Sequence, residues 1–183
     1  MQSLVFGADS AALTAGSHQI TGGEGLQFVA IGDARAERRE AVKDIVDTAV
    51  AAGSFKTLAK LLKAFFDDPD FLDKFLAAPA AKLWHHAHLG GLAEHTLGVC
   101  RLARDALNNY QLLDADLLLT GCLLHDMGKM REFSVTTYID YSDEGRLVGH
   151  VVLGDQMLME RIPRVRDFPK ELEKRLRHMI LAH

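Results

Sequence analysis

The adjacent residues His125 and Asp126 lie in the apolar run Leu-Leu-His-Asp-Met-Gly-Lys at positions 123–129. A neutral imidazole and a carboxylate can hold one divalent metal ion from a single short stretch of backbone. Gly128 and Lys129 follow, and they supply a tight turn and a cation that suit a phosphate beside that metal. These residue types therefore predict a metal-dependent hydrolase that acts on phosphate esters.

Further histidines surround this dipeptide in the sequence, since eight of the nine histidines fall between residues 85 and 183. Imidazole and carboxylate ligands together favour divalent ions such as Mn, Fe, Co, Ni or Zn. The other histidines in this part of the chain are His85, His86, His88, His95, His150, His178 and His183.

The spacing of these histidines limits which of them can share an ion. His178 and His183 are five residues apart, so on an unbroken helix they would point about 140° apart and could not easily bind one metal. His85 and His88 are three residues apart. On a helix they would share one face and could form a small site of their own.

The composition fits one ordinary domain of 183 residues with a net charge of −4. No overall positive potential therefore draws the chain to nucleic acid or to a membrane surface. The segment 161–177 is a local exception, with seven Lys and Arg residues against three Asp and Glu, a balance of +4. Its charges favour a solvated, salt-bridged helix face; the alternative is a local guide for a polyanion.

Cysteine content and apolar runs indicate the compartment. Cys100 and Cys122 lie in apolar helical stretches, where we expect small buried side chains in a reducing environment. The sequence has no apolar run of the roughly 20 residues that span a bilayer, and no basic N-terminal segment followed by an apolar one. We therefore expect a cytoplasmic protein that has no membrane partner.

The elements that position these residues are mostly helical. Residues 1–33 are rich in Gly, Ser and Thr and predict loops with one or two short strands. From Ala34 onward apolar residues recur at helical spacing. The predicted helices run from Ala34 to a stop at Gly53, over 58–66, through Phe71 and Phe75 to Pro79, over 92–110, from an N-cap at Asp114 through His125 to Gly128, over 149–161 and over 169–182.

Two segments between these helices need separate predictions. A further element is expected to begin near Ala80, to carry Trp84 and to end at Gly90. The segment 133–148 is rich in β-branched and aromatic residues, with Ser-Asp-Glu-Gly at 142–145 as a turn, so it predicts a small hairpin. The predicted fold class is mostly α: a helical bundle with a small β-hairpin insertion and a short irregular or β N-terminal segment.

The motifs Glu-His-Thr-Leu at 94–97, His-Asp-Met-Gly-Lys at 125–129 and Gly-His at 149–150 resemble the HD-domain phosphohydrolase superfamily. Around them, the segments 84–95, 141–154 and 178–183 resemble the YhaM-type 3′-to-5′ exoribonucleases. The resemblance covers about residues 55–183. It implies an HD-domain helical bundle with nuclease activity.

In that family an OB-fold module precedes the HD domain. Residues 1–33 are too few for a five-stranded OB barrel, so we expect an OB-fold remnant or a substitute there, followed by a helical HD domain over 34–183. HD proteins complete their metal site with an Asp on a helix beyond the last histidines. Because the sequence ends at His183, we expect an HD domain that is truncated at its C-terminus.

The resemblance also implies roles for single residues. Asp126 and Lys129 are the expected catalytic residues, and His150 and His183 are expected at a second metal ion. His178 is then expected either to support a metal ligand from behind or to have a structural role. Substrate phosphate contacts are expected at His85, His86, Lys129 and Arg146. The expected cofactor is one or two divalent ions, Mn²⁺ in the first place, with Fe, Co, Ni, Zn or Mg as alternatives. The full expected ligand set is His95, His125, Asp126, His150 and His183.

The function implied by the resemblance is hydrolysis of phosphodiester bonds at the 3′ end of single-stranded RNA, releasing 5′-nucleotides. Two alternatives stay open from the residues alone. One is an HD phosphohydrolase of small nucleotides, and the other is a non-catalytic module that binds a metal or a nucleotide. HD proteins of this type also assemble, so a homo-oligomer is expected.

Overall fold

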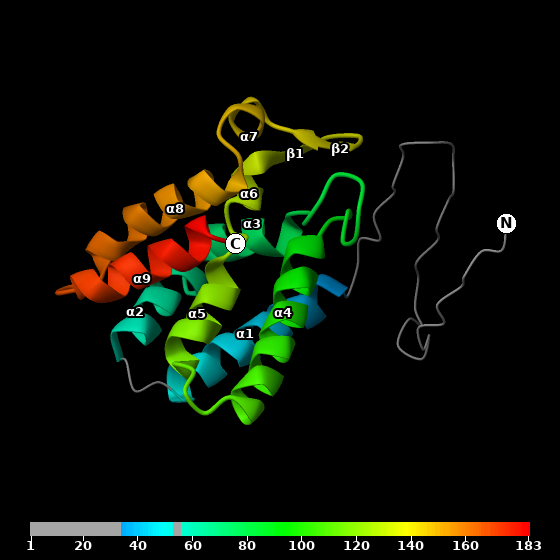
Figure 1. Ribbon diagram of the computed structural model, residues 1–183. Helices are drawn as coiled ribbons and strands as arrows, with labels where there is room; N and C mark the ends of the chain where they lie inside the picture. Colours follow the sequence, from blue (N-terminus) through cyan, green and yellow to red (C-terminus); the bar gives the residue numbers. More distant parts are fainter. Residues whose placement is uncertain (1–33, 53–55) are drawn as a thin grey trace, which may run out of the picture.

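The computed structural model describes residues 34–52 and 56–183 (Figure 1). The strands or loops predicted for 1–33 and the helix stop predicted at Gly53 lie outside the described residues. The elements are α1 (Ala34–Ala52), α2 (Lys56–Phe66), α3 (Pro69–Ala77), α4 (Gly91–Asn109), α5 (Ala115–Leu124), α6 (Lys129–Glu132), β1 (Phe133–Val135), β2 (Ile139–Tyr141), α7 (Asp143–Leu147), α8 (His150–Arg161), the 3-10 turn η1 (Ile162–Arg164) and α9 (Lys170–Leu181). The predicted mostly helical fold with a small hairpin is confirmed.

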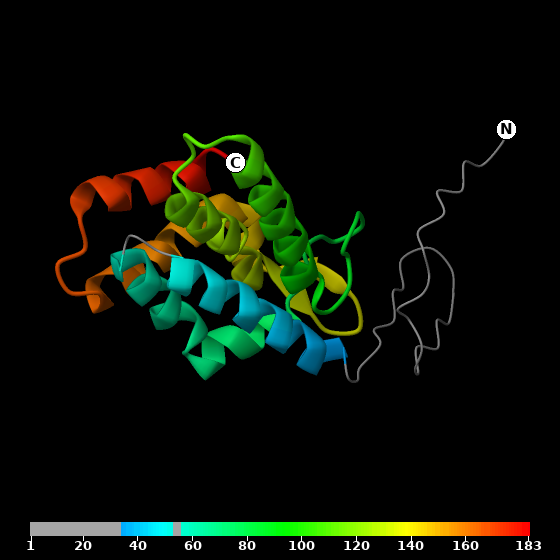
Figure 2. The same ribbon diagram turned by 90° about the horizontal axis from the view of Figure 1, so that it is seen from below.

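The helical core follows from the spacing of apolar residues. In α2 the buried side chains Leu58, Leu61, Leu62 and Phe65 recur every three or four residues and form one apolar face. The aromatic ring of Phe71 packs against that of Phe65, with a distance of 5.0 Å between the ring centroids. Viewed at right angles to the first view (Figure 2), α1 lies along α2 and passes beneath α4 and α5, which it also contacts.

The helices that carry the histidines begin and end where local signals require. The Asp114 carboxylate accepts a hydrogen bond from the backbone N–H of Leu117 at 3.0 Å, so it is the N-cap of α5, as predicted. The predicted helix over 92–110 corresponds to α4. On α4, Cys100 is a free, fully buried thiol, and this burial raises its pKa to about 12. Cys100 thus has the predicted role of a small buried side chain.

The element predicted from Ala80 to Gly90 is wrong, because this segment is a loop of bends and turns. The carbonyl of His86 accepts from the backbone N–H groups of Ala80 at 3.2 Å and His88 at 2.9 Å, and His86 has a φ of 60°. These local bonds and the left-handed backbone leave no helical path. His85 and His88 consequently share no helical face, so the face from which they could have formed a small site is absent from this loop.

The predicted hairpin exists, but its turn lies elsewhere. β1 and β2 are antiparallel, with Phe133 opposite Tyr141 and Val135 opposite Ile139, so residues 136–138 connect them. Ser142 instead caps α7, because its Oγ accepts from the N–H of Gly145 at 2.8 Å. A Ser cap followed by two acidic residues favours the start of a helix over a turn. The turn predicted at 142–145 is therefore wrong.

The last two long helices, α8 and α9, match the predicted ranges 149–161 and 169–182. Ion pairs occupy much of the basic segment 161–177: Arg161 pairs with Asp68 at 2.7 Å, Arg177 with Asp155 at 2.8 Å and Arg175 with Glu171 at 3.1 Å. These pairs fit the salt-bridged interpretation. Across 34–52 and 56–183, no helix combines the length and apolarity that a membrane span needs.

Candidate metal centre

Asp126 lies at the junction of α5 and α6, and its side chain is 3% exposed. The junction is tight, since the Lys129 N–H donates to the Asp126 carbonyl at 3.0 Å. A Cβ added at Gly128 would lie 1.9 Å from the carbonyl oxygen of His150, so only glycine lets α8 approach this closely. The backbone contact at Gly128 thereby brings the first residue of α8 next to Asp126.

One carboxylate oxygen of Asp126 faces the imidazoles of α4 and α5. Oδ2 lies 3.3 Å from Nε2 of His95 and 3.3 Å from Nε2 of His125. The two Nε2 atoms are themselves 3.4 Å apart. These three residues offer ligand atoms that all lie within 4.8 Å of one another.

The other carboxylate oxygen faces the histidines of the C-terminal part. Oδ1 lies 3.5 Å from Nε2 of His150 and 3.3 Å from Nε2 of His183. His183 follows the end of α9, and the chain end lies beside the α5–α6 junction (Figure 1). Asp126 therefore joins two groups of ligand atoms, one on each oxygen, which is the arrangement of a carboxylate that bridges two metal ions.

Hydrogen bonds made by the Nδ1 atoms of His125 and His183 determine whether the Nε2 atoms that face Asp126 carry a lone pair. His125 Nδ1 lies 2.7 Å from the carbonyl oxygen of Cys122, and His183 Nδ1 lies 2.8 Å from that of Ile180. A carbonyl only accepts, so both Nδ1 atoms carry the proton and donate it. In the neutral rings, Nε2 then presents a lone pair to an anionic carboxylate, and a cation between them satisfies both.

A third histidine, His150, is oriented by Glu132, a buried carboxylate at the end of α6. Its Oε1 accepts from His150 Nδ1 at 2.9 Å and from the His150 backbone N–H at 3.1 Å. Sequence reasoning missed Glu132. The only available signal was an acidic residue next to the apolar start of a strand, which is too common to single out a site.

Asp126 is held ionised by its neighbours. Burial disfavours its charged form, but hydrogen bonds from the His125 and His95 rings, when these carry a proton on Nε2, and from the ammonium of Lys129 outweigh burial and hold the pKa of Asp126 well below its usual range. The Nζ of Lys129 lies 2.7 Å from Oδ2. Lys129 is thus part of the centre, beside the oxygen that faces His95 and His125.

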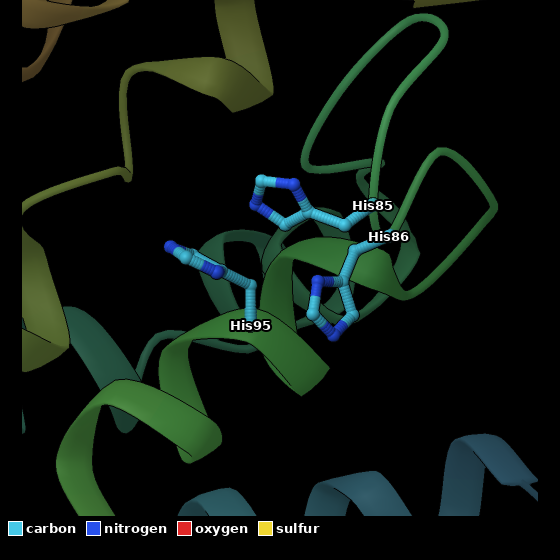
Figure 3. Close-up of side chains that lie close together, drawn as sticks. All are labelled: His85, His86 and His95. Carbon is cyan, nitrogen blue, oxygen red and sulfur yellow. The ribbon is translucent and has the colours of Figure 1, made fainter. Parts of the chain in front are cut away.

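His85 and His86 lie next to this centre on the loop before α4. Their ring centroids are 5.7 and 5.6 Å from that of His95, and Figure 3 shows all three rings bordering one space. His86 Nδ1 is buried without a hydrogen-bond partner among the described residues, and burial lowers the pKa of its ring. These three rings form another group whose ligand atoms lie within 4.8 Å of one another.

Three further residues considered from the sequence, Arg146, His88 and His178, lie outside the groups of ligand atoms around Asp126 and His95. The Arg146 guanidinium contacts Asp140 at 2.9 Å on the hairpin side of α7. His88 faces Glu94, with Nε2 3.3 Å from the carboxylate. His178 lines a surface hollow with Leu117 and Met179, so of the two C-terminal histidines it is His183 that reaches Asp126.

Comparison with known proteins adds an independent finding. The family model described as HD domain matches residues 92–183, which include His95, His125, Asp126, His150 and His183. Curated relatives named 3′-5′ exoribonuclease YhaM come from Shouchella clausii (36% identical over 109 residues, 60% of this chain and 34% of the relative), Bacillus subtilis strain 168 (36% over 112 residues, 60% and 35%) and Listeria monocytogenes serovar 1/2a (33% over 126 residues, 67% and 37%).

The chain spans about a third of the length of these curated relatives. No solved structure gives a significant match. The family model covers half of the chain and includes every residue that surrounds the Asp126 carboxylate. The chain therefore belongs to the HD-domain family.

Proposed function

We propose that the protein is a metal-dependent phosphodiesterase that shortens single-stranded RNA from its 3′ end, with residues 34–183 as its catalytic HD domain. The observation that carries the proposal is the buried Asp126, whose two oxygens face two pairs of imidazole Nε2 atoms. The names of the YhaM relatives support RNA as the substrate and the 3′ end as the site of attack.

The proposed metal ligands are His95, His125 and Asp126 on one side, and Asp126, His150 and His183 on the other. Imidazole and carboxylate donors suit Mn²⁺, which is the proposed ion, and also accept Fe, Co, Ni, Zn or Mg. When bound, such ions supply Lewis acidity to phosphate oxygens and lower the pKa of coordinated water. The protein contributes lone pairs from five side chains, the buried Asp126 carboxylate and the four imidazoles around it, with His150 and His183 partly open to solvent.

The proposed catalytic residues are Asp126, which holds the reacting centre together, and Lys129. The Lys129 ammonium next to Asp126 Oδ2 is positioned to neutralise charge on the nonbridging oxygens of the scissile phosphate. His85 and His86 border His95 from the loop and are proposed to contact the same phosphate. Arg146, farther out beside Asp140, is proposed to contact a phosphate of a neighbouring nucleotide.

The test is incubation of the protein, with any residues that follow His183, with 5′-labelled single-stranded RNA and Mn²⁺. A ladder that shortens from the 3′ end and disappears with EDTA supports the proposal. Labelled RNA that stays intact while nucleoside phosphates are hydrolysed favours the second candidate, a small-nucleotide phosphohydrolase, which the net charge of −4 also suits. If neither substrate reacts and Mn²⁺ still binds, the non-catalytic interpretation is correct.

Two further expectations accompany this proposal. RNA as substrate and two free thiols fit a cytoplasmic location. Assembly into a homo-oligomer is expected from the family, and light scattering of the purified protein tests it.

A further inference from the structure

Large aromatic side chains are exposed on two segments, the loop before α4 and the β1–β2 hairpin, which the Lys82–Asp140 ion pair joins. Trp84 in the loop before α4 is 80% exposed, Tyr138 between β1 and β2 is 51% exposed, and Tyr141 at the end of β2 is 39% exposed. Aromatic rings of this size usually bury most of their surface within the fold or at a binding site. The exposure of these rings favours the binding of a ligand that has flat apolar faces.

Two cations flank one of these rings. Lys82 Nζ lies 5.8 Å and the Arg146 guanidinium carbon 5.9 Å from the centroid of Tyr141. Both cations pair with the same carboxylate oxygen of Asp140, at 2.8 and 2.9 Å. Because two positive charges share one negative charge, the group keeps a net charge of about +1 for an anionic ligand.

The position of Tyr141 is fixed from the protein side. The ring of Phe133 packs against it at 5.1 Å between centroids, and the opposed pair Phe133 and Tyr141 closes the hairpin ladder. A ring held in place loses little conformational freedom when a ligand stacks on it. Tyr141 is therefore suited to act as a rigid stacking surface.

This surface adjoins the metal centre. The Lys82–Asp140 ion pair joins the loop to the hairpin, and Figure 1 shows the loop before α4 beside β1 and β2. The same loop continues through Trp84 to His85 and His86, whose rings border His95. A chain-like ligand lying over the hairpin can thus reach the metal centre with its end.

We propose that Trp84, Tyr138, Tyr141, Lys82 and Arg146 form a stacking platform that binds the bases and phosphates of single-stranded RNA next to its reacting 3′ end. The inference rests on the proposed function and names the part of the protein that holds the substrate. Aromatic rings interleaved with cations are the combination that binds single strands without sequence preference, because every base has a face to stack. A duplex hides these faces and fits the platform poorly.

The platform can be tested without catalysis, because Trp84 is the only tryptophan of the chain. Oligouridylate is titrated into the protein in EDTA while tryptophan fluorescence is recorded. We expect saturable quenching, and binding about tenfold weaker in Tyr141→Ala, since one stacked base contributes about this much. The control Tyr110→Ala removes another exposed tyrosine, at the far end of α4, and should bind like the wild type.

Salt dependence tests the cations in the same assay. Two phosphate contacts predict a slope of log K against log salt of about −1.4, and Lys82→Gln should reduce its magnitude by about 0.7. Lys60→Gln, which removes an exposed lysine of α2, should leave the slope unchanged. Circular dichroism of each variant checks that the fold is retained.

Several outcomes would overturn the platform: no quenching, equal weakening in Tyr141→Ala and Tyr110→Ala, or a duplex of equal length that binds as tightly as the single strand. Tryptophan emission that changes with protein concentration alone would assign the surface to contact between copies of the chain, which also overturns it. RNA shortening without quenching would reject the platform and keep the proposed function. Quenching of tryptophan fluorescence without RNA shortening would keep the platform and reject the proposed function.

Discussion

Asp126 is buried among four imidazoles and one ammonium group, and each of its oxygens has its own pair of imidazoles. The residue types at 125–129 are enough to predict a metal-binding carboxylate from the sequence. The sequence does not show that each oxygen of this carboxylate faces its own pair of imidazoles, because His150 and His183 come from elements distant in the chain. That property depends on the packing of α8 and α9 against the α5–α6 junction.

Glu132 gives the first prediction at the residue scale. Glu132→Gln removes the charge that orients His150 through its Nδ1, and changes of this kind lower metal affinity about 10- to 100-fold. Calorimetric titration of Mn²⁺ should show this loss. Glu144→Gln is the matched control, because Glu144 pairs with Arg131 away from Asp126; equal losses in both variants would contradict the role of Glu132.

Lys129 gives the second prediction. Lys129→Gln removes a cation that lies 2.7 Å from Asp126 Oδ2, so Mn²⁺ should bind at least as tightly as in the wild type. Turnover of RNA should fall by about a hundredfold if the ammonium neutralises charge in the transition state. Lys170→Gln, on α9 beside Glu173, controls for the loss of a surface charge. Undiminished turnover in Lys129→Gln would remove Lys129 from the catalytic residues.

At the element scale, the helices were predictable because their signals are local. Apolar spacing in α2 and the Asp114 cap of α5 act within a few residues. The loop before α4 was not predictable, since its path depends on the His86 carbonyl bonding to Ala80 and His88 and packing on Gly91, where a Cβ would lie 1.9 Å from that oxygen. Such contacts across a turn leave no periodic pattern in the sequence.

Two glycines give a prediction at the element scale. Gly128→Ala places a Cβ against the backbone of α8, so we expect a loss of about 2 kcal/mol or more in the free energy of unfolding and weaker Mn²⁺ binding as His150 moves away. Gly98→Ala meets nothing within 4 Å inside α4 and should stabilise the protein by about 0.5–1 kcal/mol. Urea unfolding measures both. A stable Gly128→Ala protein with full metal affinity would contradict the close approach of α8.

At the scale of the whole molecule, four separate parts of the chain meet at one carboxylate. Helix α4 supplies His95, the α5–α6 junction supplies His125 and Lys129, the start of α8 supplies His150, and the segment after α9 supplies His183. The residues that surround Asp126 were predictable because the motifs resemble those of the HD superfamily. Arg146 was predicted as a substrate contact in the same way. Glu132 and Lys82 were not predictable, since their contacts with His150 and with Asp140 are recorded by no motif.

The Asp126 centre is proposed to bind the metal that drives RNA shortening. The most direct measurement follows bound Mn²⁺ and the rate of RNA shortening in one titration, for the wild type and for Asp126→Asn, with Asp155→Asn as the control carboxylate paired with Arg177. Metal binding and rate should rise together in the wild type and the control, and Asp126→Asn should lose both, with metal affinity reduced more than about a hundredfold. Wild-type metal binding or RNA shortening in Asp126→Asn would contradict the proposal.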